Sequence, residues 1–181
     1  MSFNCPHFIE EFKGFVSTLN IKSALEVGCL SGELKDTIGA DGVDIKPSRE
    51  DVTKADICSF KSRKKYDLVF SSGLLEHYSK EEAVAIIKAM AALTRKGGYV
   101  LNYVPNTSCL AYKNAKDRSN ADWKDELDYT TEGLAELHEQ VGLTVVGTGC
   151  AASEWPKRFG PEESLAYLVY CLAKKPQEGV Y

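Results

Sequence analysis

Glycines and carboxylates in the first quarter of the chain have the spacing of a ligand-binding turn. Glu26 lies near the end of a short apolar run, and Gly28 and Gly32 follow where strand-like spacing changes to helix-like spacing. Glycine lets backbone N–H groups approach a ligand closely, and a helix start favours a carboxylate or phosphate. Asp44 ends the next short strand, where a carboxylate can accept hydrogen bonds from both hydroxyls of a ribose. Together these residues predict a nucleoside ligand, although each of them could also be purely structural.

The same turn disfavours two common nucleotide ligands. A dinucleotide fingerprint needs glycine at three places in GxGxxG, and the second and third places here hold Leu30 and Glu33. The sequence also lacks the phosphate-cradling loop that ends in GK[ST]. We therefore expect neither NAD nor a nucleoside triphosphate.

His77 is the first candidate for proton transfer, with Glu76 as the second. Histidine titrates near neutral pH, and His77 follows an apolar strand at the end that should face the cleft. The alternative is that His77 only braces the following loop. His138 lies on the apolar face of the last predicted helix and is expected to be a hydrogen-bonded core residue. His7 and Cys5 have no partners at metal-ligand spacing, so no metal site is predicted.

The elements that must position these residues alternate between strands and helices. Apolar runs bounded by glycine, proline or charged residues predict strands at residues 23–28, 42–45, 55–57, 66–70, 99–104, 143–148 and 165–173. Helical spacing predicts helices at residues 8–19, 31–38, 79–94 and 134–141, the first covering one end of the sheet and the third starting with a capping box. This alternation predicts a largely parallel sheet with helices on both faces and a site after Val27, Ile45, Phe70 and Tyr103. The last two strands should pair antiparallel at one edge, since no helix separates them.

Composition limits the class of protein. The 181 residues are 44% hydrophobic and 27% charged, which suits one compact domain over residues 1–181. A formal charge of −4 offers no general attraction to phosphate backbones, so nucleic acid is not an expected partner. No apolar run approaches the roughly 18 residues of a membrane span. Six cysteines without a CxxC pair, and no leader-like N-terminal segment, favour reduced thiols in a cytoplasmic protein.

Four segments carry a further signal when they are taken together. They read LEVGCLSGEL (residues 25–34), GVDIKP (42–47), YDLVFSSGLLEH (66–77) and RKGGYV (95–100). In this order they resemble the class I S-adenosylmethionine-dependent methyltransferases. The resemblance implies an α/β fold, a three-layer Rossmann-like sandwich whose mostly parallel seven-stranded sheet has an antiparallel last strand. It also implies S-adenosyl-L-methionine as cofactor and S-adenosyl-L-homocysteine as product, bound by residues 21–105 behind an N-terminal helix in residues 1–20.

The resemblance also places the cofactor on particular residues. Asp44 would hold the ribose, and the implied cofactor-binding set is Glu26, Gly28, Cys29, Gly32, Asp44, Ile45, Asp56, Ile57, Ser71 and Ser72. One departure concerns the middle glycine of the family's turn, which is Leu30 here. The Leu30 side chain could crowd the cofactor, or it could point away if the turn keeps a negative φ.

The sequence does not identify the methyl acceptor, and a small molecule is the expected class. Tyr103, Asn106, Trp123 and Tyr129, in or beside a polar aromatic stretch without a regular assignment, could cover the acceptor or anchor the loop to the core. Trp155, between the last two strands, should open toward the same rim, so residues 106–181 would form the acceptor side. We expect methyl transfer, and the alternative is a catalytically silent binding or partner subunit.

Overall fold

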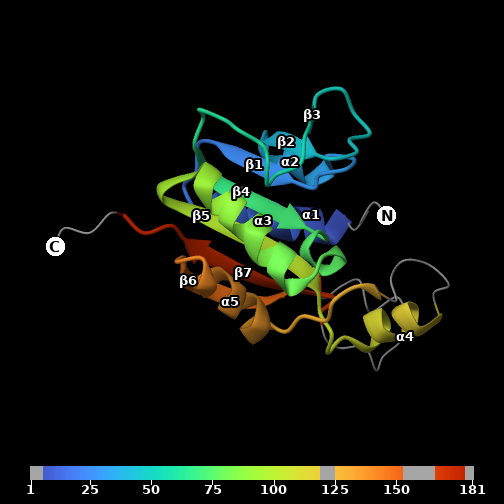
Figure 1. Ribbon diagram of the computed structural model, residues 1–181. Coiled ribbons are helices and arrows are strands. Elements are labelled where there is room, and N and C mark those ends of the chain that lie inside the picture. The colour runs from blue at the N-terminus through green and yellow to red at the C-terminus, as the bar shows by residue number, and fades with distance from the viewer. Residues whose placement is uncertain (1–5, 119–124, 153–165, 178–181) are drawn as a thin grey trace.

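The computed structural model describes residues 6–118, 125–152 and 166–177 (Figure 1). Its strands form a seven-stranded sheet in the order β3-β2-β1-β4-β5-β7-β6. The strands are β1 (Ala24–Val27), β2 (Asp41–Asp44), β3 (Thr53–Lys54), β4 (Tyr66–Ser72), β5 (Thr94–Pro105), β6 (Thr144–Ala151) and β7 (Leu168–Lys174). The expected sheet is confirmed, because β7 pairs antiparallel with β5 and β6 whereas the other neighbours pair parallel.

The direction of strand order reverses beside β1. On one side, Leu25 of β1 pairs with Asp41 of β2, and on the other side it pairs with Val69 of β4. The chain thus builds β2 and β3 on one flank of β1 and continues with β4 and β5 on the opposite flank. In open α/β sheets, a crevice for ligands lies outside the carboxyl ends of the strands at such a reversal.

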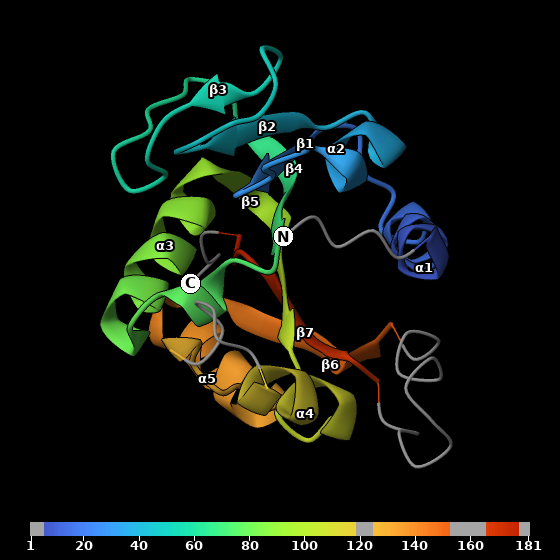
Figure 2. The same ribbon diagram turned by 90° about the vertical axis from the view of Figure 1, so that its right-hand side faces the viewer.

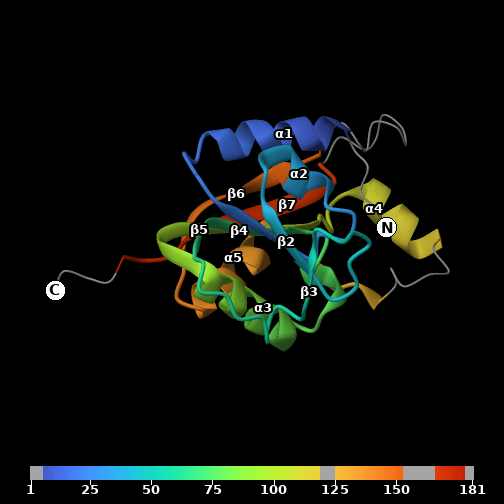
Figure 3. The ribbon, with the colours of Figure 1, turned by 90° about the horizontal axis from the view of Figure 1, so that it is seen from above.

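Helices cover both faces of the sheet, which confirms the three-layer arrangement (Figures 2 and 3). α1 (Pro6–Ser17) and α2 (Glu33–Ile38) lie on one face, and α3 (Lys80–Leu93) and α5 (Thr131–Gln140) lie on the other. α1 covers the face of the sheet and not its end as expected. Its buried Phe8, Phe12 and Val16 recur every four residues, and the ring of Phe12 lies 5.0 Å from that of Phe70.

α3 begins with the predicted capping box. The side chain of Ser79 accepts a hydrogen bond from the N–H of Glu82, and the Glu82 carboxylate accepts one from the N–H of Ser79. Ile87 and Met90 on the same helix are fully buried against the sheet. In the part of the chain that the structure describes, no helix combines the length and the apolar composition that crossing a bilayer requires.

Two of the sequence-based assignments need correction. The region 106–129 contains a helix, α4 (Leu110–Arg118), because a turn in which the N–H of Cys109 bonds to Asn106 leads into it and Tyr112 anchors it in the core. The third strand is Thr53–Lys54, not 55–57. Asp56 instead starts a turn, since its carboxylate accepts the N–H of Cys58 and its carbonyl accepts the N–H of Phe60.

Candidate functional site

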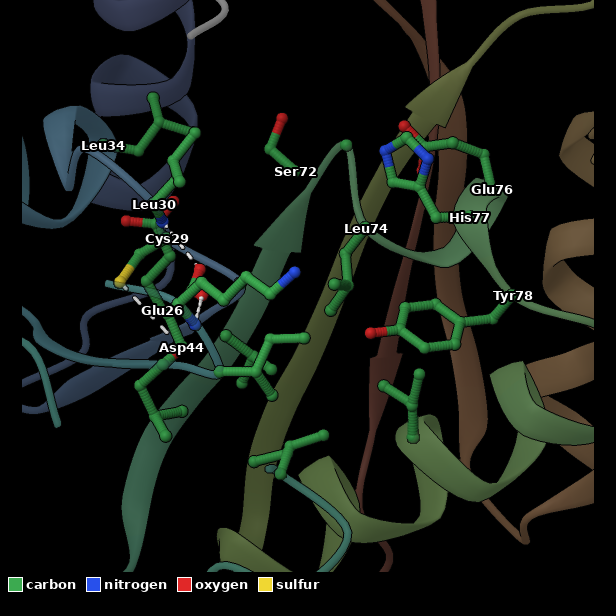
Figure 4. A pocket seen from close by; sticks show the side chains of 18 of the residues that line it. Glu26, Cys29, Leu30, Leu34, Asp44, Ser72, Leu74, Glu76, His77 and Tyr78 are labelled. Carbon is green, nitrogen blue, oxygen red and sulfur yellow. Dashed lines mark hydrogen bonds between the residues drawn. The ribbon is translucent and has the colours of Figure 1, made fainter. Parts of the chain in front are cut away.

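A pocket of about 780 Å³ lies where the carboxyl ends of β1, β2 and β4 meet (Figure 4). This volume falls within the range of about 300–1,000 Å³ that is usual for small-molecule sites. Nine candidate residues line it: Glu26, Gly28, Cys29, Asp44, Ile45, Asp56, Ile57, Ser72 and His77. Most of the predicted cofactor set therefore converges on one cavity.

Asp44 joins the two parts of the predicted nucleoside site. It ends β2 and is 9% exposed. Its Oδ2 accepts a hydrogen bond from the N–H of Leu30 at 2.9 Å, and its Oδ1 accepts one from the N–H of Lys46 at 2.6 Å. Because each carboxylate oxygen has two lone pairs, both oxygens can still accept a hydroxyl from the pocket side.

Glu26 closes the start of α2. Gly32, the N-cap of this helix, has no side chain to cap it. The Oε2 of Glu26 accepts the N–H of Lys35 at 2.8 Å and so satisfies one of the free donors of the first turn. Burial raises the pKa of Glu26 to about 8, although the bond from Lys35 opposes this shift.

The turn between β1 and α2 has left-handed backbone at three positions. Gly28 and Gly32 have φ of 71°, and Leu30 has φ of 35°. A Cβ on Gly28 would come within 2.7 Å of Cδ1 of Leu74, so the turn and Leu74 approach each other as closely as glycine allows. The φ of Leu30 is therefore positive, and the alternative of a negative φ is wrong. Leu30 is 39% exposed and lines the pocket. Left-handed backbone is costly for a leucine, so this position is strained.

The segment after β4 forms the opposite wall. Figure 4 shows Leu74, Glu76, His77 and Tyr78 across the pocket from Asp44. Glu76 is 3% exposed, and burial followed by the nearby charge of Glu126 raises its pKa to about 8. The side chain of His77 is 48% exposed, and its Nδ1 lies 3.6 Å from Oε1 of Glu126. Of the two candidates for proton transfer, Glu76 is therefore the one enclosed by the protein.

Two members of the predicted cofactor set lie outside the pocket wall. Gly32 caps α2, and a Cβ there would face Lys35 and Arg49. Ser71 is buried, and its Oγ accepts a hydrogen bond from Nδ2 of Asn102 at 2.7 Å. The alternation of side chains along β4 sends Ser71 to the face opposite Ser72.

His138 continues the buried hydrogen-bond network that joins Ser71 to Asn102. Its Nε2 lies 2.7 Å from Oδ1 of Asn102, and its Nδ1 lies 2.8 Å from the carbonyl oxygen of Leu134. Burial lowers the pKa of His138 to about 4, so the ring is neutral near pH 7. The prediction of a hydrogen-bonded core histidine is confirmed.

The predicted acceptor residues that the structure describes lie in the core and not in the pocket wall. Tyr103 packs edge-on against Phe8, with ring centroids 5.1 Å apart. Asn106 donates to the carbonyl of Ala166 and accepts from the N–H of Ser108. Tyr129 is 3% exposed. Asn106 and Tyr129 anchor the loop to the core, as the alternative interpretation held, whereas Tyr103 packs against α1. Trp123 and Trp155 lie outside the described residues.

The pocket wall also contains residues that sequence reasoning did not place there. Leu74, Tyr78, Glu126 and Tyr167 line it, and Glu76 was considered only behind His77. Glu126 and Tyr167 come from beyond residue 105, where no local pattern marks them, and only the packing of α4 and β7 brings them to the site. Among the residues that the structure describes, no group of histidine, cysteine and acidic side chains could hold a metal ion.

Comparisons with known proteins agree with this geometry at the level of the fold. No protein-family model and no curated protein sequence matches the chain. A solved S-adenosylmethionine-dependent methyltransferase from Clostridium acetobutylicum ATCC 824 is similar in structure, with a TM-score of 0.69 and 12% identity, over 96% of this chain and 94% of that one. The N-methyltransferase NodS from Bradyrhizobium japonicum WM9, in complex with S-adenosylhomocysteine, has a TM-score of 0.67 and 14% identity, over 97% of this chain and 90% of that one.

A third similar solved structure contains two bound small molecules. It is the 1,6-didemethyltoxoflavin-N1-methyltransferase from Burkholderia thailandensis, with bound 1,6-didemethyltoxoflavin and S-adenosylhomocysteine. Its TM-score is 0.68 at 17% identity, over 93% of this chain and 78% of that one. This chain has the fold of the class I S-adenosylmethionine-dependent methyltransferases.

Proposed function

We propose that the chain binds S-adenosyl-L-methionine in this pocket and transfers its methyl group to a small-molecule acceptor. The observation that carries the proposal is the convergence of the left-handed turn at residues 28–32 and the Asp44 carboxylate on one cavity. The fold supports the same function, and two of the three structural neighbours described above hold S-adenosylhomocysteine.

The residues present fit this cofactor. Asp44 would accept the two ribose hydroxyls, Ile45 and Ile57 would enclose the adenine, and the turn at residues 28–32 would lie against the methionine part. Ile45 is 49% exposed and lines the pocket, so its side chain is accessible to the adenine. When bound, the cofactor supplies a methyl carbon that its sulfonium already activates. The chain has to align the acceptor with that carbon and exclude water.

We extend the proposal to organisation and location. Residues 1–181 would act as one unit, with residues 21–105 on the cofactor side and residues 106–181 on the acceptor side. We place the protein in the cytoplasm. The free thiols support this location, because a reducing compartment keeps cysteines unpaired. Five cysteines within the described ranges are free: Cys29, Cys58, Cys109, Cys150 and Cys171.

One observation favours a second candidate, a catalytically silent binding or partner subunit. Leu30 places a branched side chain at strained left-handed backbone in the pocket wall, where a glycine would leave more room. If Leu30 blocks the cofactor, the folded protein binds neither S-adenosylmethionine nor its product.

Calorimetry of the wild-type protein tests the proposal. We expect saturable binding of S-adenosylmethionine and of S-adenosylhomocysteine, and no binding of NADH, which the turn disfavours. A folded sample that binds neither of the first two compounds would contradict methyl transfer and support the silent subunit. Binding of both compounds without labelled-methyl transfer to any acceptor supplied in a metabolite extract would support a silent binder.

A further inference from the structure

Glu76 carries a buried carboxyl group at the carboxyl end of β4. It belongs to the short 3-10 helix η1 (Leu75–His77) and lines the pocket. Its Oε1 lies against Gly73, where a built Cβ would stand 3.4 Å away. Its Oε2 has no hydrogen-bond partner among the described residues. Buried polar groups nearly always have a partner, so the unpaired oxygen leaves a hydrogen-bonding position beside the pocket that a ligand donor can fill.

Glu126 adds a second carboxyl group to the same wall. It is 9% exposed, and its Oε2 accepts the hydroxyl of Tyr112 at 2.8 Å. The N–H of Leu127 donates to the carbonyl of Glu76 at 2.7 Å, which ties the two segments together. The negative charge of Glu126 contributes to the raised pKa of Glu76, so the two groups lie within electrostatic range.

The charge on this wall has one sign. Of the described residues that line the pocket, Lys46 alone is a lysine or arginine, and its N–H bonds to Asp44 on the cofactor side. Figure 4 shows Glu76 on the other side of the pocket from Asp44. An acceptor that carries a carboxylate or phosphate would meet repulsion from Glu126 and would oppose the ionisation of Glu76, whereas an amino group would bring N–H donors and a positive charge that favours ionised Glu76.

We propose that the methyl acceptor carries an amino nitrogen, which Glu76 and Glu126 bind. This inference rests on the proposed methyl transfer and names the acceptor class of that same site. The amine enters as an ammonium ion, and ionised Glu76 removes one proton from it. The freed lone pair of the nitrogen forms the new N–C bond. The C–S bond breaks, its electron pair stays on sulfur, and the positive charge of the sulfonium passes to the methylated nitrogen.

The surroundings of Glu76 suit this proton transfer. With a pKa near 8, its ionised form is a stronger base than an ordinary glutamate, and a bound cation favours that ionised form. The titratable groups that face Glu76 are His77, Glu126, Tyr112, Tyr129 and Tyr167. Burial raises the pKa of the three tyrosines, so their hydroxyls stay neutral near pH 7.

The first part of the test separates the acceptor from the cofactor. Calorimetry compares S-adenosylhomocysteine binding to wild type, Glu76→Gln and Glu126→Gln, with Glu81→Gln at an exposed position of α3 as the matched control. We expect the same affinity for all four proteins, because neither carboxyl group serves the cofactor. Loss of affinity in Glu76→Gln would overturn the inference, whereas no binding by the wild type would instead overturn the proposed function.

The second part uses three acceptors with one skeleton. 2-Phenylethylamine, 2-phenylethanol and phenylacetate, each at millimolar concentration, are incubated with labelled S-adenosylmethionine and the wild-type protein. We expect the amine to be methylated at least about tenfold faster than the others, and Glu76→Gln to lower kcat for the amine about a hundredfold, with Glu81→Gln unchanged. Preference for the alcohol or the acid, equal use of all three, or no detectable reaction or binding of the amine would overturn the inference.

Discussion

The backbone N–H of Leu30 donates a hydrogen bond to Oδ2 of Asp44 at 2.9 Å. One residue lies in the turn after β1 and the other ends β2, so a single bond joins the two features on which the proposed nucleoside binding depends. Asp44 thus has two tasks: it holds the left-handed turn in place and presents its remaining lone pairs to the pocket. Substitutions of the two residues test both tasks.

Asp44→Asn should weaken both the turn and the ligand. The amide group has one acceptor oxygen and a donor nitrogen, so it cannot accept the N–H groups of Leu30 and Lys46 together with two ribose hydroxyls. We expect the free energy of unfolding to fall by about 1–3 kcal/mol and the affinity for S-adenosylhomocysteine to fall about tenfold or more. Denaturant unfolding and calorimetry measure the two effects. Asp117→Asn, at an exposed position of α4, is the control, and equal affinities in the two variants would remove Asp44 from the ribose site.

Leu30→Gly should relieve strain and open the pocket. A leucine in left-handed backbone costs about 1–2 kcal/mol, and the greater flexibility of glycine in the unfolded chain offsets about 0.5–1 kcal/mol of that gain. We therefore expect stability to stay the same or rise slightly, and S-adenosylhomocysteine to bind several-fold more tightly. Leu30→Ala keeps the Cβ but shortens the side chain, and so isolates crowding from strain. Weaker binding by Leu30→Gly would show that Leu30 is a favourable cofactor contact.

Gly28→Ala should destabilise the protein more than Gly39→Ala. Both glycines have positive φ, but a Cβ on Gly28 would stand 2.7 Å from Leu74, whereas a Cβ on Gly39 meets nothing within 4 Å. Gly39→Ala therefore reports the backbone strain alone, about 1–2 kcal/mol. The difference between the two variants, measured by denaturant unfolding, reports the close approach of Leu74. Adding Leu74→Ala to Gly28→Ala should cancel most of this difference, and an unchanged difference would mean that Leu74 does not restrict the turn.

Glu76 should contribute a fall in the stability of the protein as the pH rises from about 4.5 to about 8. The pKa of Glu76 is raised from 4.5 to about 8 in the folded chain, so its contribution is complete below pH 4.5 and is lost as the pH approaches 8. Within this window one such proton contributes a slope of about 1.4 kcal/mol per pH unit. Glu76→Gln removes this slope and leaves that of Glu26, which shifts in the same direction. Unfolding curves at several pH values measure it, and a stability gap between variant and wild type that does not grow with pH would contradict the burial of Glu76.

The sequence predicted the cofactor side of the site better than the acceptor side. Gly28 and Asp44 lie close to strand ends within short βα units, where local spacing and strand direction decide position. Glu126 and Tyr167 reach the pocket only through the packing of α4 and β7, which no local pattern reveals. Tyr103 is a different case: its place at a strand end was correct, but the alternation of side chains along β5 turns it toward α1 and into the core.

The positive φ of Leu30 also could not be predicted from the sequence. A leucine is expected to avoid positive φ, so a negative φ was a reasonable alternative. The bonds from the Leu30 N–H to Asp44 and from the Ser48 hydroxyl to the Leu30 carbonyl hold it in the left-handed region. Both partners follow α2 in the chain, so the strain at Leu30 depends on tertiary structure and not on its neighbours.

The most direct measurement is a crystal structure of the protein grown with S-adenosylhomocysteine. We expect both ribose hydroxyls to lie within hydrogen-bond distance of the Asp44 carboxylate and the amino acid end to follow the turn at residues 28–32. The sulfur should then face the side of the pocket that contains Glu76. Density for the ligand elsewhere, or a ribose that does not touch Asp44, would contradict the account.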